Sequence, residues 1–286
     1  MGYERIQVRP ISGAIGAEIH GADLSKTLDD QTFAEVRRAF REHLVIFFRD
    51  QTMTIDQHKA FCLRFGTLDV DRFVVPAIPE HPELIVVIKK EGEKFAFGNA
   101  WHSDVTFYEK PPLGSVLYAL EVPPYGGDTL FSNTYLAYET LSSGMRATID
   151  GLRAVHTAVG AYDLAAQARK FTEERTIKIR QDREHEAQAE MAHPVVRTHP
   201  ETGRKCLFVN ASYTKRIEGM TEAESKPLLN YLYEHITRPE FTCRFRWRKN
   251  SVAFWDNRVA QHYANNDYHG FLRVMHRITI EGDRPV

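Results

Sequence analysis

The sequence predicts a mainly β fold, a β-sandwich or barrel with flanking helices. Many short β-rich runs separated by polar turns are typical of such folds. The longest wholly apolar runs, residues 44–48 and 84–88, have the length and the β-branched or aromatic content of buried strands. Two amphipathic segments near the N-terminus are expected to pack as helices outside a sheet.

Four segments show helical features. The first carries Phe33, Val36 and Phe40 on one face. The last begins with Thr221 and Glu224 in the spacing of a capping box, in which each residue bonds the backbone of the other. The predicted helices are residues 31–43, 54–64, 135–152 and 221–236.

Strands are predicted between and after these helices, at residues 44–48, 84–88, 115–120, 129–132, 195–198, 206–209, 242–247, 252–255 and 272–280. We expect residues 1–286 to form a single domain, because a chain of this length buries about three-quarters of its unfolded surface. Residues 162–192 are charged and lack clear periodicity. This pattern predicts a mobile insertion or lid, with a solvated surface helix as the alternative.

The composition points to a small-molecule partner. The chain has 37 Lys and Arg against 38 Asp and Glu, so it lacks the basic field that nucleic acid or an anionic membrane would need. The three cysteines show no ligand-like spacing, and the N-terminus lacks the apolar region of a secretory signal. We therefore expect a cytoplasmic protein that binds neither nucleic acid nor a membrane.

His102 and Asp104 are the first candidates for chemistry. They lie two residues apart, so on an extended strand both side chains would face the same way. One imidazole and one carboxylate would then converge. For this pair alone, a hydrogen-bonded scaffold or surface pair is the simpler interpretation.

His262 is a candidate third metal ligand. It follows the polar turn Asp256-Asn257-Arg258 at the end of an apolar strand. Two histidines and one carboxylate form the facial arrangement of non-haem Fe(II) oxygenases, because the open positions can take a chelating cosubstrate and O₂. The same residues would also suit a zinc hydrolase with a bound water.

Two arginines lie on the last predicted strand. Alternation puts Arg273, Met275, Arg277 and Thr279 on one face, and the opposite face is apolar enough to be buried. If the strand is central, both faces are covered, and paired arginines on a covered face imply anions to bind. The polar outer face of an edge strand is the alternative.

Taken together, these residues resemble the taurine / 2-oxoglutarate-dependent dioxygenase family. The resemblance rests on His-x-Asp at 102–104, on His262 after Trp-Asp-Asn-Arg, and on Arg273 eleven residues further along. It extends over nearly the whole chain, through residues 10–17, 124–129, 193–200 and 282–283. No single motif is specific, but their ordered set is.

The resemblance implies a double-stranded β-helix, or distorted jelly roll, with iron at its open end. The implied catalytic residues and Fe(II) ligands are His102, Asp104 and His262. Arg273, helped by the Thr129 hydroxyl, would bind the distal carboxylate of the cosubstrate 2-oxoglutarate, for which an always-charged bidentate donor is suited. The implied reaction consumes O₂, releases succinate and CO₂, and hydroxylates a carbon next to a heteroatom, so that a C–S, C–O–S or aryl-ether linkage breaks.

The expected substrate pocket departs from that of the taurine enzyme. Asp71 and Val74 lie where that enzyme has a His and a Tyr, and a desolvated Asp71 would repel a sulfonate unless it turned outward. Gly98 replaces an Asn and Tyr213 replaces a Phe. Residues 3–6 and 216–244 are instead similar to the aryloxyalkanoate dioxygenases, whose aromatic tails Val74 and Tyr213 would suit. The implied substrate contacts are Arg277, Asp71, Val74, Gly98, Asn99, Val105 and Tyr213.

Three classes of protein remain open at this point. The first is an Fe(II)- and 2-oxoglutarate-dependent oxygenase acting on a small sulfonate, sulfate ester or aryloxyalkanoate. The second is a zinc hydrolase, which leaves Arg273 without a function. The third is a catalytically silent jelly-roll protein that binds an anion, although every member of the iron and cosubstrate set is present. By analogy with the family we expect a homo-oligomer, a dimer or a tetramer.

Overall fold

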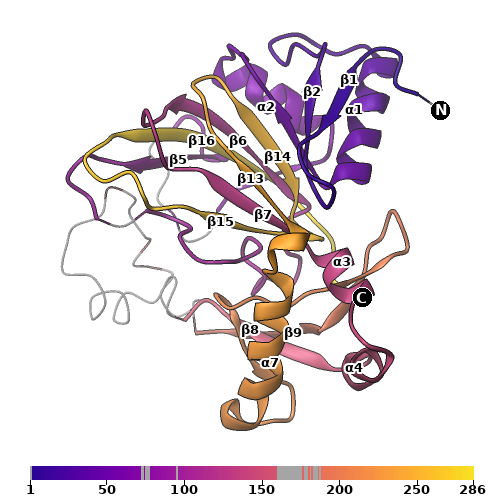
Figure 1. The fold of residues 1–286 in the computed structure, drawn as a ribbon. Helices are drawn as coiled ribbons and strands as arrows, with labels where there is room; N and C mark the ends of the chain where they lie inside the picture. Colours follow the sequence, from indigo (N-terminus) through magenta and orange to yellow (C-terminus); the bar gives the residue numbers. More distant parts are fainter. Residues whose placement is uncertain are drawn as a thin grey trace.

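Two facing sheets form the centre of the computed structural model, which describes residues 2–71, 74, 78–94, 96–159, 176, 180, 182, 186 and 188–286 (Figure 1). The larger sheet contains β1 (Gln7–Pro10), β2 (Ala17–His20), β3 (Val45–Phe48), β4 (Leu68–Asp69), β5 (Leu84–Lys89), β6 (Gly114–Glu121), β14 (Val252–Asp256) and β16 (Arg273–Ile280). The smaller sheet contains β7 (Thr129–Asn133), β13 (Thr242–Phe245) and β15 (Ala260–Ala264).

Strand β16 is central in the larger sheet. The order is β1-β2-β3-β14-β6-β16-β4, and β5 also pairs with β16, antiparallel from Arg273 opposite Lys89 to Ile278 opposite Leu84. On its other side β16 pairs with β6. Strands pair with both edges of β16, which confirms the central rather than the edge position. Its arginine face is covered, because Arg273 and Arg277 are both buried.

Aromatic side chains fill the space between the two sheets. The ring of Phe47 on β3 stacks on Phe245 of β13, with ring centroids 3.9 Å apart, and also contacts Phe131 of β7. Burial of such rings supplies a large part of the free energy that holds the sheets together. Met275 on β16 belongs to the same buried cluster.

Helices α1 (Asp30–His43) and α2 (Ile55–Leu63) cover the outer face of the larger sheet (Figure 1). Phe40 of α1 stacks on Phe254 of β14 with ring centroids 4.0 Å apart. Both helix starts are capped by side chains, Asp29 for α1 and Thr54 for α2. The two N-terminal helices therefore lie outside the sheet, as the sequence predicts.

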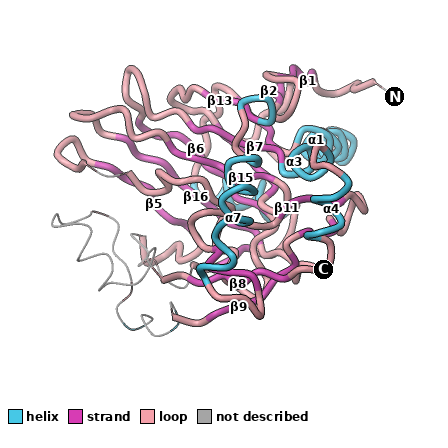
Figure 2. Tube along the Cα trace, turned by 60° about the horizontal axis from the view of Figure 1, so that its bottom comes forward, coloured by secondary structure: helices cyan, strands magenta, loops and turns pink. Residues whose placement is uncertain are grey.

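A third layer packs beside the sandwich. It contains β8 (Arg153–Thr157), β9 (Glu190–Pro194), β10 (Val196–Thr198), β11 (Lys205–Leu207), β12 (Thr214–Ile217), α3 (Thr134–Glu139), α4 (Ser143–Ile149), α7 (Glu222–Ile236) and the 3₁₀ helix η2 (Pro239–Phe241). Two views show α7, β8 and β9 on the side of the molecule opposite to β1 and β2 (Figures 1 and 2). The capping box at Thr221 and Glu224 opens α7 as predicted.

The single helix predicted over 135–152 is wrong, because two short helices occupy this segment. The Thr140 hydroxyl donates a 2.7 Å hydrogen bond to the Leu136 carbonyl, where α3 ends. Ser142 then caps a new helix, because its hydroxyl accepts the backbone N–H of Met145. Hydroxyl side chains that bond nearby backbone groups compete with helix continuation, and the two caps divide the segment.

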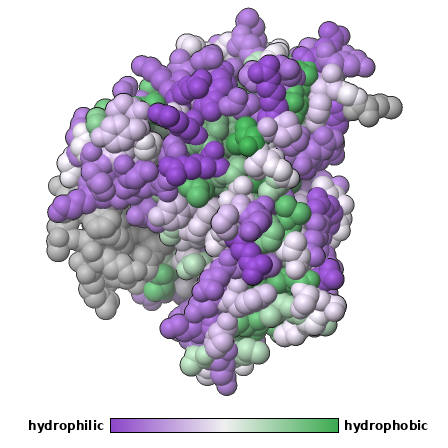
Figure 3. Space-filling view, viewed as in Figure 1, coloured by the Kyte–Doolittle hydropathy of each residue, from purple (hydrophilic) through white to green (hydrophobic). Residues whose placement is uncertain are grey.

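The predicted strands are all present, with bounds shifted by a few residues; the largest differences are at β11 and β13, which end at Leu207 and Phe245. Most of the expected lid over 162–192 lies outside the described residues. None of the helices in the described part of the chain is long and apolar enough to cross a bilayer. Hydrophilic residues cover most of the face seen in Figure 3, and the hydrophobic ones form separate small groups.

Candidate metal centre and cosubstrate pocket

The sandwich brings His102 and His262 together through their backbones. His262 lies on β15, and a single antiparallel bridge joins it to His102, with N–H···O distances of 3.1 and 2.8 Å in the two directions. The imidazole centroids lie 4.1 Å apart. Residues that are 160 positions apart in the sequence are thus held side by side by the main chain.

Asp104 completes a three-residue cluster with these histidines. Its Oδ1 lies 3.7 Å from His102 Nε2 and 3.8 Å from His262 Nε2. One donor atom from each residue lies within 4.8 Å of the other two, and the described residues contain no other such group of His, Cys, Asp or Glu. Three converging donors from two imidazoles and one carboxylate match the 2-His-1-carboxylate arrangement.

Neighbours orient the remaining polar atoms of His102 and Asp104, whereas the buried Nδ1 of His262 has no hydrogen-bond partner. His102 Nδ1 lies 2.7 Å from the Ala100 carbonyl, so it carries the proton and leaves the Nε2 lone pair free to bind a metal. Asp104 Oδ2 accepts a 2.9 Å hydrogen bond from the Ser115 hydroxyl. Two of the three candidate ligands are therefore held by side-chain hydrogen bonds before any ion binds, and His262 is held by its backbone bridge to His102.

The segment carrying Asp104 is a turn, so the expected extended strand is wrong. The Asn257 side chain accepts the Asp104 N–H at 2.6 Å and donates to its carbonyl at 3.0 Å. The next residue, Val105, has φ 40°, a left-handed conformation that is unfavourable for a β-branched residue. His102 and Asp104 still converge, because this clamp and not strand alternation directs the carboxylate.

The electrostatics of the cluster favour the protonation states that bind metal. Burial opposes ionisation of Asp104, but Arg277 and the two histidines hold the pKa of its carboxyl well below the usual range. Burial is the main cause that lowers the pKa of His262 to about 3, with His102 adding to it. An ionised carboxylate and a neutral imidazole are the forms that coordinate a metal at neutral pH.

Arg273 lines a cavity beside the cluster, together with Thr129 and His102. The guanidinium is 5% exposed, and its Nε and Nη2 have no hydrogen-bond partner. Thr129 Oγ1 accepts a bond from Trp247 Nε1 at 2.9 Å, so its own proton can be donated into the cavity. Buried unpaired donors are costly, so their presence indicates an anion.

Arg277 faces the cluster from the same strand and contacts two carboxylates. Its Nη1 lies 3.2 Å from Asp104 Oδ1, and its Nη2 lies 3.6 Å from Asp71 Oδ2. The Asp71 side chain is only 9% exposed, and its Oδ1 accepts the backbone N–H of Val74 at 2.8 Å. Asp71 therefore turns inward, against the outward orientation that taurine would require.

The other predicted substrate contacts divide into two groups. Gly98 lines the cavity with φ 84°, and a Cβ there would lie 3.4 Å from His102 Cε1. Val74, Val105 and Tyr213 belong to the buried apolar cluster between the sheets, and Tyr213 meets the His102 ring edge-on. Asn99 is exposed and does not line the cavity.

Several side chains of the cavity wall are not marked by the sequence pattern. They are Val87, Phe97, Leu117, Trp255 and Ala264. Alternation along their strands could have placed Val87 and Leu117 on the inner face of the sheet. Nothing in the local sequence pattern shows which of the inward-facing residues lie at the open end of the sandwich, where the cavity is.

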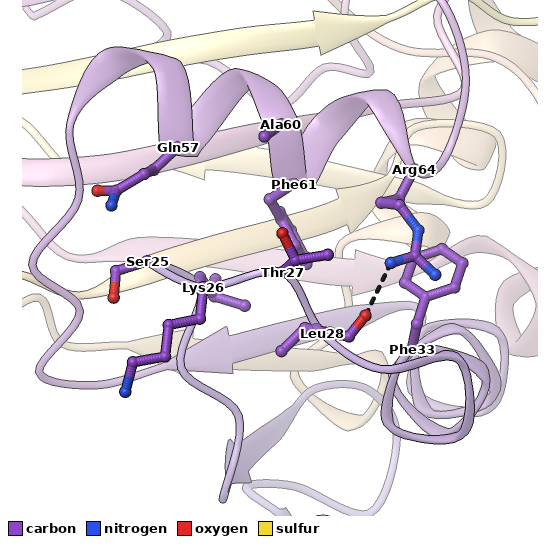
Figure 4. A pocket seen from close by; sticks show the side chains of 10 residues that line it. Ser25, Lys26, Thr27, Leu28, Phe33, Gln57, Ala60, Phe61 and Arg64 are labelled. Atoms are coloured by element: carbon purple, nitrogen blue, oxygen red, sulfur yellow. Dashed lines mark hydrogen bonds between the residues drawn. The ribbon is translucent and has the colours of Figure 1, made fainter.

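A second pocket, of about 570 Å³, lies between α2 and residues 24–28 (Figure 4). Arg64 closes it by donating to the Leu28 carbonyl at 2.9 Å, and its guanidinium lies 4.0 Å from the centre of the Phe33 ring. No buried polar side-chain atom of the described residues that line this pocket lacks a partner. The cavity with unpaired donors, at Arg273, is therefore the candidate site.

Comparison with known proteins agrees with this geometry. Residues 7–279 match the family model described as "Taurine catabolism dioxygenase TauD, TfdA family". The chain is 38% identical to an alpha-ketoglutarate-dependent sulfate ester dioxygenase of Pseudomonas putida (98% of this chain, 91% of that protein). It is 37% identical to an alkylsulfatase of Acinetobacter baylyi (98% and 86%).

A crystal structure of a taurine dioxygenase from Burkholderia xenovorans superposes with a TM-score of 0.81 at 41% identity, covering 99% of this chain and 93% of that one. The two facing sheets are thus the double-stranded β-helix that the resemblance implies, and the zinc hydrolase and the silent binding protein are not supported. Fe(II), 2-oxoglutarate and O₂ are the cofactor and cosubstrates of this chemistry. The chain belongs to the TauD/TfdA family and is a 2-oxoglutarate-dependent non-haem iron dioxygenase.

Proposed function

We propose that this enzyme hydroxylates a small organic anion with an apolar tail, at a carbon next to a heteroatom. The proposed Fe(II) ligands are His102, Asp104 and His262. Arg273 and Thr129 bind the distal carboxylate of 2-oxoglutarate, and Arg277 binds the anionic head of the primary substrate. The observation that carries the proposal is the convergence of three metal-binding donors beside a buried arginine with unpaired donors.

The donor set fits a ferrous ion. Two neutral imidazoles and one carboxylate leave coordination positions open, which a closed structural zinc site does not. Bound Fe(II) supplies the activation of O₂, which is coupled to the conversion of 2-oxoglutarate into succinate and CO₂. His102 is held by the bond that it donates to the Ala100 carbonyl, and Asp104 by the bond that it accepts from the Ser115 hydroxyl, so these two ligands need little reorganisation when the ion enters.

The cavity beside the ligands fits the cosubstrate. 2-Oxoglutarate has a carboxylate at each end, and the end far from the metal needs a fixed positive partner. Arg273 supplies it from the first position of β16, and its two unpaired donors match two carboxylate oxygens. Desolvation in this cavity strengthens the ion pair.

The substrate side of the cavity fits an organic anion. Arg277 is its cation, and Val87, Phe97 and Leu117 supply an apolar wall for an alkyl or aryl tail. Sulfate esters, sulfonates and aryloxyalkanoates share this combination of an anionic head and a carbon bearing a heteroatom. Hydroxylation there gives a hemiacetal-like product that collapses, which breaks the linkage.

Taurine fits this site less well than its apolar analogues. Asp71 is paired with Arg277 and partly neutralises its charge. An incoming anion must therefore displace the Asp71 carboxylate from Arg277 or share Arg277 with it. The relatives named for sulfate esters make alkyl sulfates the first substrates to test.

The test is an assay of succinate release and O₂ consumption with a panel of alkyl sulfates, alkyl sulfonates, taurine and aryloxyalkanoates of matched tail length. We expect stoichiometric succinate and O₂ consumption, stimulated most by the anions with apolar tails. Stimulation by taurine alone would contradict the proposed role of the apolar wall. Stimulation by a neutral alcohol as strong as that by the sulfate of matched tail length would contradict the proposed role of Arg277.

The family match over residues 7–279 supports a single dioxygenase domain. The lid over 162–192, the dimer or tetramer and the cytoplasmic location stay predictions.

A further inference from the structure

A lysine lies beside Arg273 inside the sandwich. Lys89 is the last residue of β5 and the register partner of Arg273 on β16. Directly paired residues of antiparallel strands project to the same face. That face is the inner one, because Val87 and Ile85, two and four residues before Lys89, belong to the buried cluster between the sheets. Two cations therefore project side by side into the protein interior.

Neither cation has its hydrogen bonds satisfied. Lys89 is 3% exposed and its Nζ has no partner, while Arg273 Nε and Nη2 lack partners as well. The Tyr268 side chain contacts both cations. The centre of its ring is 4.7 Å from Lys89 Nζ, and its hydroxyl interacts with Arg273. The ring attracts the ammonium by a cation–π contact, but it does not replace the hydrogen bonds that an anion or a water molecule would accept.

The described carboxylates around the two cations do not satisfy them. Asp128 acts on Arg273 through its charge, but its Oδ2 accepts a 2.6 Å bond from Arg244, an ion pair at the rim of the sandwich. Glu93 and Glu91 act on Lys89 through their charge, and Lys89 Nζ still has no hydrogen-bond partner. Burying two cations costs free energy of desolvation, which is recovered only when an anion is bound. The pair thus indicates a ligand with negative charge near Arg273.

We propose that Lys89 is a second cationic contact for the distal carboxylate of 2-oxoglutarate, an inference that rests on the proposed role of Arg273. A carboxylate offers about four lone-pair positions. It can therefore accept from the Arg273 guanidinium, the Thr129 hydroxyl and the Lys89 ammonium together. The doubled charge makes the enzyme selective for 2-oxo diacids over 2-oxo acids that lack the distal carboxylate.

The test compares two ligands on variants that differ by one charge. Lys89→Met keeps the length of the side chain and removes the ammonium, and Lys90→Met is the matched control at the exposed neighbouring position. Dissociation constants of 2-oxoglutarate and of 2-oxopentanoate, which has a methyl group in place of the distal carboxylate, are measured by calorimetry with the Mn(II)-loaded protein without O₂. Lys89→Gln serves as a second variant if Lys89→Met does not fold.

We expect Lys89→Met to weaken 2-oxoglutarate binding by about tenfold or more, as for a lost charge-assisted contact, and to leave 2-oxopentanoate binding within about twofold. Lys90→Met should bind both ligands like the wild type. Unchanged 2-oxoglutarate binding in the Lys89 variants, or an equal loss for both ligands, would overturn the proposal. A wild-type protein that does not prefer 2-oxoglutarate to 2-oxopentanoate would instead refute the assignment of Arg273 itself.

Discussion

Arg273 and Arg277 share one face of one strand, yet their surroundings assign them different tasks. Arg273 has unpaired donors in the cavity, and Arg277 contacts Asp104 and Asp71. We expect Arg273→Leu to weaken 2-oxoglutarate binding by about 2–5 kcal/mol, the cost of removing one partner of a buried charged pair. We expect Arg277→Leu to raise the KM of the organic anion and to change the 2-oxoglutarate dissociation constant by less than about threefold. Equal losses of 2-oxoglutarate affinity in the two variants would refute this division.

Asp71 is the residue whose replacement should improve binding. Asp71→Asn keeps the acceptor for the Val74 N–H and removes the charge that compensates Arg277. Because a carboxylate a few ångströms from an anion costs about 1–3 kcal/mol at the effective dielectric of such sites, the KM for organic anions should fall by about tenfold. Steady-state kinetics with an alkyl sulfate measures this change. A higher KM would mean that Asp71 binds the substrate directly.

Among the elements, the turn after His102 positions Asp104 in the proposed metal site. Asn257 holds both backbone groups of Asp104 from the end of β14, and Val105 keeps its left-handed φ within this clamp. Asn257→Ala should therefore weaken Mn(II) or Fe(II) binding by about 10- to 100-fold, as for other groups that orient metal ligands. A metal titration measures the loss. Asn230→Ala, at an exposed position of α7, should bind metal like the wild type, and equal binding by both variants would contradict the role of the clamp.

Sequence patterns predict the faces of single strands but not the contacts between distant segments. Alternation correctly predicts the inward face of β16, because pairing with β5 and β6 holds the strand extended and every second side chain then projects to the same face. The apolar run 84–88 stops one residue short of Lys89, since a pattern built on hydrophobicity ends at the first charge. The bridge between His102 and His262 and the ion pair of Asp71 with Arg277 depend on chain segments far apart in sequence, so no local signal could place them.

For the whole molecule, buried histidines predict loss of stability in acid. Burial lowers the pKa of His58 and His156 to about 3 and that of His193 to about 4, well below the ordinary value of 6.5. Between pH 6.5 and about 4 the unfolded chain binds protons that the folded chain does not. The free energy of unfolding therefore falls as the pH is lowered, by up to about 4 kcal/mol per pH unit for three such groups.

Urea unfolding at a series of pH values between 7.5 and 5 measures this slope. His156→Gln should reduce it by about 1.4 kcal/mol per pH unit, and replacement of the exposed His269 should leave it unchanged. A free energy of unfolding that does not change over this range would show that the three histidines accept protons within the folded state.

We propose that His102, Asp104 and His262 bind Fe(II) in a way that lets 2-oxoglutarate chelate it. The most direct test is an anaerobic titration of 2-oxoglutarate into the Fe(II)-loaded protein, followed by visible absorption. We predict that the weak charge-transfer band of the chelate appears with saturation in the wild type and is lost in Asp104→Ala. Absence of the band in the wild type, or a band of full intensity in Asp104→Ala, would contradict the account.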